Sequence, residues 1–131
     1  MAEGAAKSLA EAQRTVPEGR AGTLVGVAGT TTTVQALALG LPFYDPEAIH
    51  RSVLSRADAE RVTRDLARMT VAERAALPVM ARGREDVIVA GALILLEIFR
   101  RWGFDRCVVS EKDILDGLVI EMLAAEDFPL P

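Results

Sequence analysis

The chain has 131 residues, half of them hydrophobic, so it is of single-domain size and can bury a sizeable core. Its formal net charge of −4 argues against a protein whose overall field draws it to nucleic acid or to an anionic membrane. A single cysteine excludes an intramolecular disulfide and any multi-cysteine metal site, and the sequence opens without the apolar core of a signal peptide, so we expect a cytoplasmic protein.

The N-terminal segment, residues 1–22, predicts a helix followed by a loop. Residues 2–13 are rich in alanine with scattered charge, which is typical of a helix, and Pro17, Gly19 and Gly22 then mark a loop. The sequence opens almost inside this helix, where a preceding strand or turn would be expected. We therefore expect either a truncated form of a longer chain or a partial gene.

Residues 23–38 carry the most informative pattern, in which a short apolar strand (residues 23–28) runs into a Gly-Thr turn and then a helix. Gly29 lets the backbone approach a ligand closely, and free N–H groups at the start of a helix attract anions such as phosphate. The hydroxyls of Thr30 and Thr31 could add donors. An equally good interpretation is that Thr30 or Thr31 only caps the helix, because the pattern is neither the Walker phosphate loop nor the full dinucleotide fingerprint.

The middle of the chain predicts two further helices. Residues 49–54 could form a short extended piece, after which Ser55 caps a helix with one apolar and one charged face. The charged face offers two pairs of opposite charge four residues apart, which are Glu60 with Arg64 and Arg61 with Asp65. Residues 70–73, Thr-Val-Ala-Glu, have the capping-box pattern, which predicts a short helix ending near Pro78.

The apolar run at residues 87–96 is too short to cross a bilayer, which needs about 20 apolar residues, so we interpret it as the central core helix. It ends near Gly103, a residue that can take the left-handed cap. Residues 105–109 then form a second strand, and Ser110 is expected to cap a final helix. The apolar face of that helix consists of Ile114, Leu115, Leu118, Val119 and Met122.

This order of elements predicts an α/β fold in which two parallel strands are joined by a long helical crossover, with about five to six helices in all. Antiparallel partners usually connect through a short hairpin, and the sequence has no hairpin signal. Two strands are few for an independent sheet, so we expect either missing strands or another molecule to cover the exposed edge.

Ligands bind beyond the carboxyl ends of parallel strands, and both strand ends here carry polar residues that suit a phosphorylated ligand and a divalent cation. Arg84 could hold phosphate in a bidentate manner, or Arg84 and Asp86 could simply start the core helix, and Arg82 has the same ambiguity. Glu111 could orient a cation or a water molecule.

Three other polar or reactive features have structural interpretations. Ser110 with Asp113 makes a good helix cap and needs no ligand. His50 has no second histidine, serine elbow or cysteine partner, so we do not expect it to be catalytic. Cys107 lies within an apolar strand, where a small buried side chain is expected rather than a reactive thiolate.

Three stretches together resemble the Ppx/GppA family of exopolyphosphatases and guanosine pentaphosphate phosphatases. They are Gly-Val-Ala-Gly-Thr-Thr-Thr-Thr (residues 26–33), Arg-Gly-Arg-Glu-Asp-Val-Ile-Val-Ala-Gly-Ala-Leu-Ile-Leu (residues 82–95) and Val-Ser-Glu-Lys-Asp-Ile-Leu-Asp-Gly (residues 109–117). Their order and separation match bacterial members of the family. The resemblance implies the actin-like ATPase architecture of two ribonuclease-H-like domains, with residues 23–125 as the C-terminal part of the second domain and residues 126–131 as a tail.

By the same resemblance, Gly26, Gly29, Thr30 and Thr31 match the turn that binds phosphate or nucleotide in the wider superfamily. No stretch resembles the family's glycine-rich phosphate loops or the region that carries its water-activating glutamate. The resemblance therefore implies a fragment of a phosphoanhydride hydrolase that acts on inorganic polyphosphate or guanosine pentaphosphate, with Mg²⁺ in the complete enzyme. Alone, the chain would supply phosphate-binding groups and have little or no turnover.

Two alternatives stay open. The chain could be a noncatalytic module that binds phosphate or nucleotide, or that assembles through its strand edge as a homodimer or with the missing N-terminal half. It could also be a kinase-like or heat-shock-like relative that binds adenine nucleotide at the same turn. None of these interpretations calls for a nucleic-acid or membrane partner.

Overall fold

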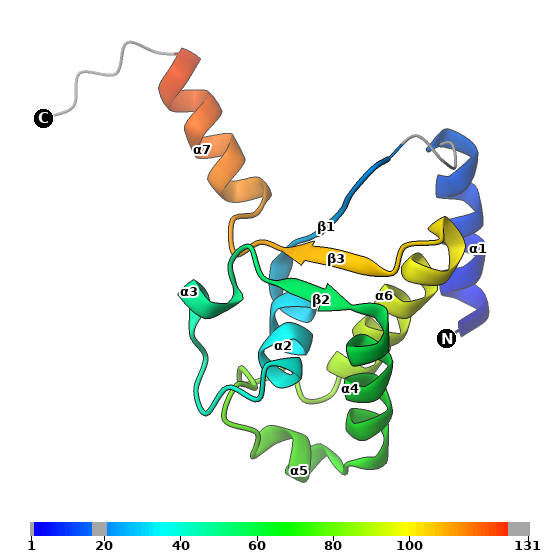
Figure 1. Ribbon diagram of the computed structural model, residues 1–131, viewed down its shortest axis with the longest axis vertical. Helices are drawn as coiled ribbons and strands as arrows, with labels where there is room; N and C mark the ends of the chain where they lie inside the picture. Colours follow the sequence, from blue (N-terminus) through cyan, green and yellow to red (C-terminus); the bar gives the residue numbers. More distant parts are fainter. Residues whose placement is uncertain (1, 17–20, 126–131) are drawn as a thin grey trace, which may run out of the picture.

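The computed structural model describes residues 2–16 and 21–125, which form seven helices and a three-stranded sheet (Figure 1). In chain order the elements are α1 (Ala2–Thr15), β1 (Leu24–Gly26), α2 (Ala28–Ala38), α3 (Pro46–Ile49), β2 (Val53–Ser55), α4 (Arg56–Arg68), α5 (Val71–Ala75), α6 (Ile88–Trp102), β3 (Arg106–Val109) and α7 (Ile114–Ala125). The predicted loop residues Pro17 and Gly19 and the predicted tail at residues 126–131 lie outside the described residues.

The sheet is mixed, with the strand order β1-β3-β2. β1 lies parallel to β3, as the long helical crossover between them predicted. β2 lies antiparallel along the other side of β3, so the prediction of two parallel strands alone was wrong. β2 has three residues and is followed by α4, α5 and α6 rather than by a hairpin, which leaves no turn signal for its pairing in the sequence.

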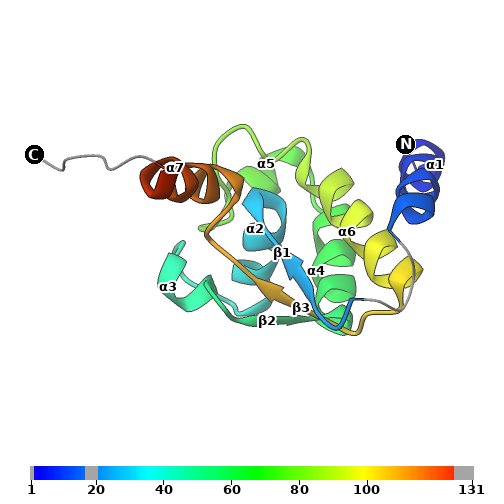
Figure 2. The ribbon, with the colours of Figure 1, turned by 90° about the horizontal axis from the view of Figure 1, so that it is seen from above.

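The helices α2, α4 and α6 cover one face of this sheet, and no described helix lies over the strands on the other face (Figure 2). Successive side chains of a strand point to opposite faces. Leu54 and Cys107, which are paired across β2 and β3, are fully buried beneath the helices. Val25 and Val53 are both paired with Val108 on the other face, where they are 55% and 54% exposed.

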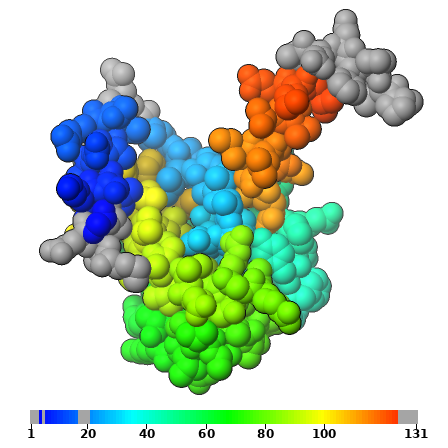
Figure 3. Space-filling view, turned by 180° about the vertical axis from the view of Figure 1, so that it is seen from behind, coloured from blue at the N-terminus to red at the C-terminus, as the bar shows by residue number. Residues whose placement is uncertain are grey.

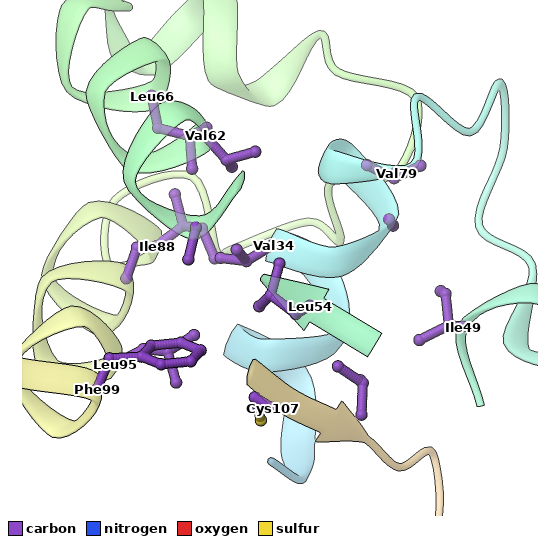
Figure 4. Packing of buried hydrophobic residues seen from close by; sticks show 14 residues of the cluster. Val34, Ile49, Leu54, Val62, Leu66, Val79, Ile88, Leu95, Phe99 and Cys107 are labelled. Carbon is purple, nitrogen blue, oxygen red and sulfur yellow. The ribbon is translucent and has the colours of Figure 1, made fainter. Parts of the chain in front are cut away.

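The hydrophobic core is centred on α6, as predicted from its apolar run. Ile88, Leu95 and Phe99 of this helix lie among buried residues of α2 and α4, and Phe99 has no exposed surface (Figure 4). The helix ends at Trp102, where Gly103 adopts the predicted left-handed conformation with φ of 68°. No described helix is both long and apolar enough to span a membrane.

The predicted caps of α4 and α5 are confirmed, whereas the predicted charge pairs are not. The Ser55 hydroxyl accepts a hydrogen bond from the Asp58 N–H, and Thr70 and Glu73 form a reciprocal capping box at α5. The ion pairs on the solvent face of α4 are Arg56 with Glu60 and Arg61 with Asp58, both at 3.0 Å. The predicted pairs Glu60–Arg64 and Arg61–Asp65 were therefore wrong, because Glu60 and Arg61 each pair with a residue nearer the start of the helix.

The last helix, α7, stands out from the rest of the molecule (Figures 1 and 3). It forms at the predicted place, but its predicted apolar face is not buried by any described element. Its exposed apolar residues, each more than half accessible, are Ile114, Leu115, Leu118, Val119, Ile120, Met122 and Leu123. The two helices with the most apolar sequences, α6 and α7, thus have opposite environments.

Candidate functional site

The two strand ends that the sequence singled out lie side by side. Gly26 at the end of β1 is paired with Val109 at the end of β3, and the Ser110 N–H donates a hydrogen bond to the Gly26 carbonyl at 2.9 Å. The segment that leads into α2 and the loop that leads into α7 therefore leave the same edge of the sheet, as predicted for parallel strands.

The start of α2 has no side-chain cap. The helix begins at Ala28, and the N-cap residue is Val27, whose apolar side chain cannot accept a hydrogen bond. The interpretation of Thr30 or Thr31 as the cap was therefore wrong, because the helix begins before both residues. Backbone N–H groups in the first turn of a helix have no intrahelical acceptor, so those of Gly29 and Thr30 are suited to a ligand. Ala28 has φ of 65°, a left-handed conformation that costs a non-glycine residue about 1 kcal/mol.

The threonine side chains and Gly26 occupy packing positions. A Cβ at Gly91 would lie 2.6 Å from the Thr30 Oγ1, so the absence of a side chain at Gly91 allows α2 and α6 to approach closely. Thr31 is 7% exposed and fills the space next to Gly26, where a Cβ would also come within 2.8 Å of the Cys107 sulfur. Gly26, Thr30 and Thr31 thus contribute to the packing of α2, and phosphate binding by these three residues stays a prediction.

Arg84 lies directly over Gly29. The space that a Cβ at Gly29 would need is filled by the guanidinium group of Arg84, so only glycine permits this approach. Among the described residues, no carboxylate forms an ion pair with Arg84. The structure therefore brings together two of the predicted residues, which are far apart in the sequence, and leaves the positive charge of one of them without a counter-ion.

A second arginine shows what a purely structural role looks like. The guanidinium group of Arg74 donates hydrogen bonds to the carbonyl oxygens of Leu66, Met69 and Glu85 at 3.1, 2.7 and 2.7 Å. These bonds hold α5 against the end of α4 and the segment before α6. Arg84 has no such set of acceptors among the described residues, which leaves its donors available to a ligand.

A pocket of about 230 Å³ opens beside the Arg84 guanidinium. Its lining combines residues of α2 and Arg84 with Tyr44 and the segment before α6. Its lining residues are Gly29, Thr32, Thr33, Tyr44, Pro78, Val79, Met80, Ala81 and Arg84. Gly29 and Arg84 are the two predicted site residues in this lining.

Tyr44 is a residue of the site that the sequence reasoning missed. Its hydroxyl donates a hydrogen bond to the Glu111 carboxylate at 2.7 Å, which joins the loop after α2 to the loop after β3. Burial raises the pKa of Tyr44, a Thr32 hydroxyl beside it acts in the opposite direction, and Glu111 adds to the rise. The Tyr-Asp-Pro turn was visible in the sequence, but its contact with a residue 67 positions later was not.

Glu111, the residue predicted to orient a cation or water, lies at the rim of the pocket through this bond to Tyr44. Its backbone N–H donates to the His50 Nδ1 at 3.2 Å, so His50 helps to place the loop. In the described part of the chain, no three His, Cys, Asp or Glu side chains come together as a metal site. Glu111 alone would not hold Mg²⁺, which is bound through carboxylates together with water and substrate phosphates.

The loop that carries Glu111 is closed by its own polar residues. The Ser110 hydroxyl accepts from the Lys112 N–H at 3.0 Å and does not reach α7. Asp113 accepts from the Leu115 N–H at 2.9 Å, and the Asp113 N–H donates to Asp116 at 2.9 Å. The prediction of Ser110 as the cap of α7 was therefore wrong, since Asp113 and Asp116 take this role. Cys107 is buried as predicted, and burial raises the pKa of its thiol.

The chemical groups of the site are the Arg84 cation and the uncapped N–H groups of α2, together with the Glu111 carboxylate that is held by Tyr44 at the rim of the pocket. Guanidinium and helix N-terminal N–H groups are the usual protein partners of phosphate oxygens. A general base and a second cation are not present in this arrangement. Among the described residues, the arrangement is therefore suited to an anionic ligand.

Comparison with known proteins gives a consistent picture. Residues 1–126 match the model of the Ppx/GppA phosphatase family. The chain is 47% identical over 118 residues to "Exopolyphosphatase 2" of Mycobacterium tuberculosis, covering 87% of this chain and 37% of that protein. It is 35% identical over 99 residues to the "Bifunctional 3-dehydroquinate synthase/phosphatase" of Fusobacterium nucleatum, covering 75% of this chain and 14% of that protein.

Solved structures agree with these sequence matches. A crystal structure of an exopolyphosphatase-like protein aligns with a TM-score of 0.90 and 35% identity over 95% of this chain and 42% of its own. The Aquifex aeolicus member of the Ppx/GppA family aligns with a TM-score of 0.84 and 25% identity over 98% of this chain and 40% of its own. The chain thus spans about two fifths of these structures, which contain the actin-like ATPase domain that the resemblance implied.

Proposed function

The chain belongs to the Ppx/GppA phosphatase family, and from this we propose that it forms the phosphate-binding part of an exopolyphosphatase-like hydrolase acting in the cytoplasm. The observation that carries this proposal is the unpaired guanidinium group of Arg84 lying over Gly29 at the uncapped start of α2. Such a pair of donors binds two oxygens of one phosphate group or adjacent oxygens of a polyphosphate chain.

Hydrolysis of a phosphoanhydride needs a positioned water molecule, a carboxylate base and cations that neutralise the transferred phosphoryl group. The described residues supply the donors and, at the rim, Glu111. Mg²⁺ would neutralise phosphate charge in the complete enzyme, and its carboxylate ligands would have to come from outside the described residues. We therefore expect this chain alone to bind polyphosphate and to release little or no phosphate from it.

The binding proposal is tested by isothermal titration calorimetry with a polyphosphate of defined length, using Arg84→Ala and Arg82→Ala. Both residues are exposed and both substitutions remove one positive charge, but only Arg84 lines the pocket. We expect at least about tenfold weaker binding for Arg84→Ala, because a hydrogen bond to a charged group contributes about 1.5–3 kcal/mol. Equal weakening by both substitutions would mean that net charge alone attracts the ligand, and would contradict the proposal.

A second candidate ligand, a guanosine polyphosphate, is favoured by the apolar side of the pocket. Tyr44, Pro78 and Met80 line the same pocket as Arg84, and a nucleobase could lie against these side chains. Binding of GTP in preference to tripolyphosphate, lost in Tyr44→Leu, would support this ligand. ATP binding as tightly as GTP would instead favour the adenine-nucleotide alternative.

A further inference from the structure

His50 lies where two segments far apart in the sequence run side by side. It directly follows α3, and the N–H of the next residue, Arg51, donates to the Val109 carbonyl at the end of β3 at 2.7 Å. The Val109 N–H donates in return to the Ser52 carbonyl at 2.9 Å. Figures 1 and 2 show α3 and the loop after β3 at the same end of the sheet. These bonds fix the His50 backbone relative to the loop that carries Glu111.

In the described part of the chain, two hydrogen bonds join Glu111 to other elements. Its backbone N–H donates to the Nδ1 of His50 at 3.2 Å, and its Oε1 accepts from the Tyr44 hydroxyl at 2.7 Å. The side-chain bonds of Ser110 and Asp113, in contrast, stay within the loop and the start of α7. His50 therefore anchors the Glu111 backbone, and the Glu111 carboxylate is left to hold Tyr44.

The bond to Glu111 sets a requirement on the His50 ring. An imidazole nitrogen accepts a hydrogen bond only when it carries no hydrogen, so the Nδ1 must be bare and the ring hydrogen must be on Nε2. A side chain that replaces His50 must offer an acceptor where Nδ1 lies. The amide of asparagine reaches that place, whereas the longer glutamine brings its amide to the place of Nε2.

Tyr44 carries the effect of these contacts into the pocket. Its side chain lines the pocket together with Thr32 and Arg84. The Thr32 hydroxyl and the Arg84 charge both act on its phenol group, so the Tyr44 hydroxyl is within reach of α2 as well as of Glu111. A side chain that is held in place before the ligand arrives lowers the entropic cost of binding.

We propose that His50 is a positioning residue of the candidate site, which holds the Glu111 backbone so that the Glu111 carboxylate keeps Tyr44 at the wall of the pocket. The proposal rests on the proposed function, because it concerns the pocket beside Arg84. It extends that function to a residue outside the pocket lining. His50 acts through Glu111 and Tyr44 and does not touch the ligand itself.

These contacts can be measured one by one, because the chain has one histidine and one tyrosine. An N–H···N hydrogen bond gives a scalar coupling between its two nitrogens in nuclear magnetic resonance, and we expect this coupling between the Glu111 amide and the His50 Nδ1. The absorbance of the phenolate gives the pKa of Tyr44, which burial and the bond to Glu111 raise above its usual 10.0.

Two variants of His50 separate the acceptor from the mere presence of a polar side chain. His50→Gln loses the acceptor at the Nδ1 place, so we expect the pKa of Tyr44 to fall toward 10.0 and tripolyphosphate to bind roughly two- to tenfold more weakly in calorimetry. His50→Asn keeps the acceptor and should restore both quantities. Glu111→Ala removes the next contact and should lower the pKa of Tyr44 at least as much as His50→Gln.

Three results would overturn the proposal. They are no coupling between the two nitrogens, equal behaviour of His50→Asn and His50→Gln, or a lowered pKa of Tyr44 in His50→Gln with unchanged tripolyphosphate binding. Circular dichroism shows that both variants keep the fold, and the coupling in the unmodified chain needs no variant at all. Absence of tripolyphosphate binding by the unmodified chain would overturn both proposals, whereas loss of binding in Arg84→Ala with equal binding by the two His50 variants would overturn only this one.

Discussion

Two helices of this protein have similar apolar sequences and opposite environments. α6 begins Ile-Val-Ala-Gly and α7 begins Ile-Leu-Asp-Gly, and both continue with leucine and isoleucine. α6 buries Ile88, Leu95 and Phe99 in the core, whereas Ile114 at the start of α7 is 83% exposed. The comparison teaches that an apolar helix in a sequence predicts burial against other protein surface. It does not predict which segment supplies that surface.

The largest expected contrast is between a buried and an exposed side chain of these helices. Phe99→Ala removes a fully buried ring from α6 and should lower the free energy of unfolding by about 3–5 kcal/mol. Met122→Ala truncates a side chain of α7 that is 62% exposed and should change it by less than about 0.5 kcal/mol. Urea unfolding followed by the fluorescence of Trp102 measures both. A similar loss in both variants would show that α7 is packed in solution.

An intermediate contrast uses the glycine at the fourth position of each helix. A methyl group at Gly91 would collide with Thr30, so Gly91→Ala should destabilise the protein by about 1–3 kcal/mol through overpacking. Gly117 has nothing within 4 Å of its would-be Cβ, so Gly117→Ala should favour α7 by up to about 1 kcal/mol. Thermal unfolding and helix content by circular dichroism report the two effects, and effects of the same sign would break the comparison.

The smallest expected effect concerns acid. A backbone hydrogen bond from Asp113 holds the pKa of Asp116 below its usual 3.8, with Lys112 acting in the same direction. Because the folded state binds this proton more weakly than the unfolded chain, the contribution is present above pH 3.8 and is lost as the pH falls through the lower folded value. At α6, the pKa of Glu97 is held below its usual 4.5, chiefly by the hydrogen bond with Arg100.

Carboxyl-detected nuclear magnetic resonance measures this acid titration. Asp116 should titrate below 3.8, and the amide exchange at the start of α7 should rise with its protonation while that at the start of α6 does not. Asp116→Asn should remove this pH dependence. Titration of Asp116 at or above 3.8 would show that its bond to the Asp113 N–H is not formed in solution.

Much of the fold could be predicted because its signals are local. The caps at Ser55 and Thr70 and the left-handed Gly103 depend on residues within one turn of a helix, and each was found from the sequence. β2 was predicted only as part of an extended piece at residues 49–54, and its place in the sheet was missed because it pairs with β3 more than 50 positions later, without a hairpin. The exposure of α7 could not be predicted, since periodicity indicates an apolar face and not its partner.

The same difference between local signals and long-range contacts applies to the candidate site. Gly29 and Arg84, which line the pocket, were predicted as phosphate ligands because a glycine before a helix and an arginine at the start of the core helix have a general chemistry with phosphate. Tyr44 was missed because its role depends on Glu111, which only the folded chain brings to it. Thr30 and Thr31 were predicted as donors from their hydroxyls, but whether such hydroxyls face a ligand or a neighbouring helix depends on packing that the sequence does not show.

The rate at which the single thiol is alkylated can measure how often the fold opens. Cys107 lies in the middle strand with no exposed surface, and burial disfavours its thiolate, so an alkylating reagent reaches it only when the sheet separates from its helices. The rate of modification therefore reports how often the strands part.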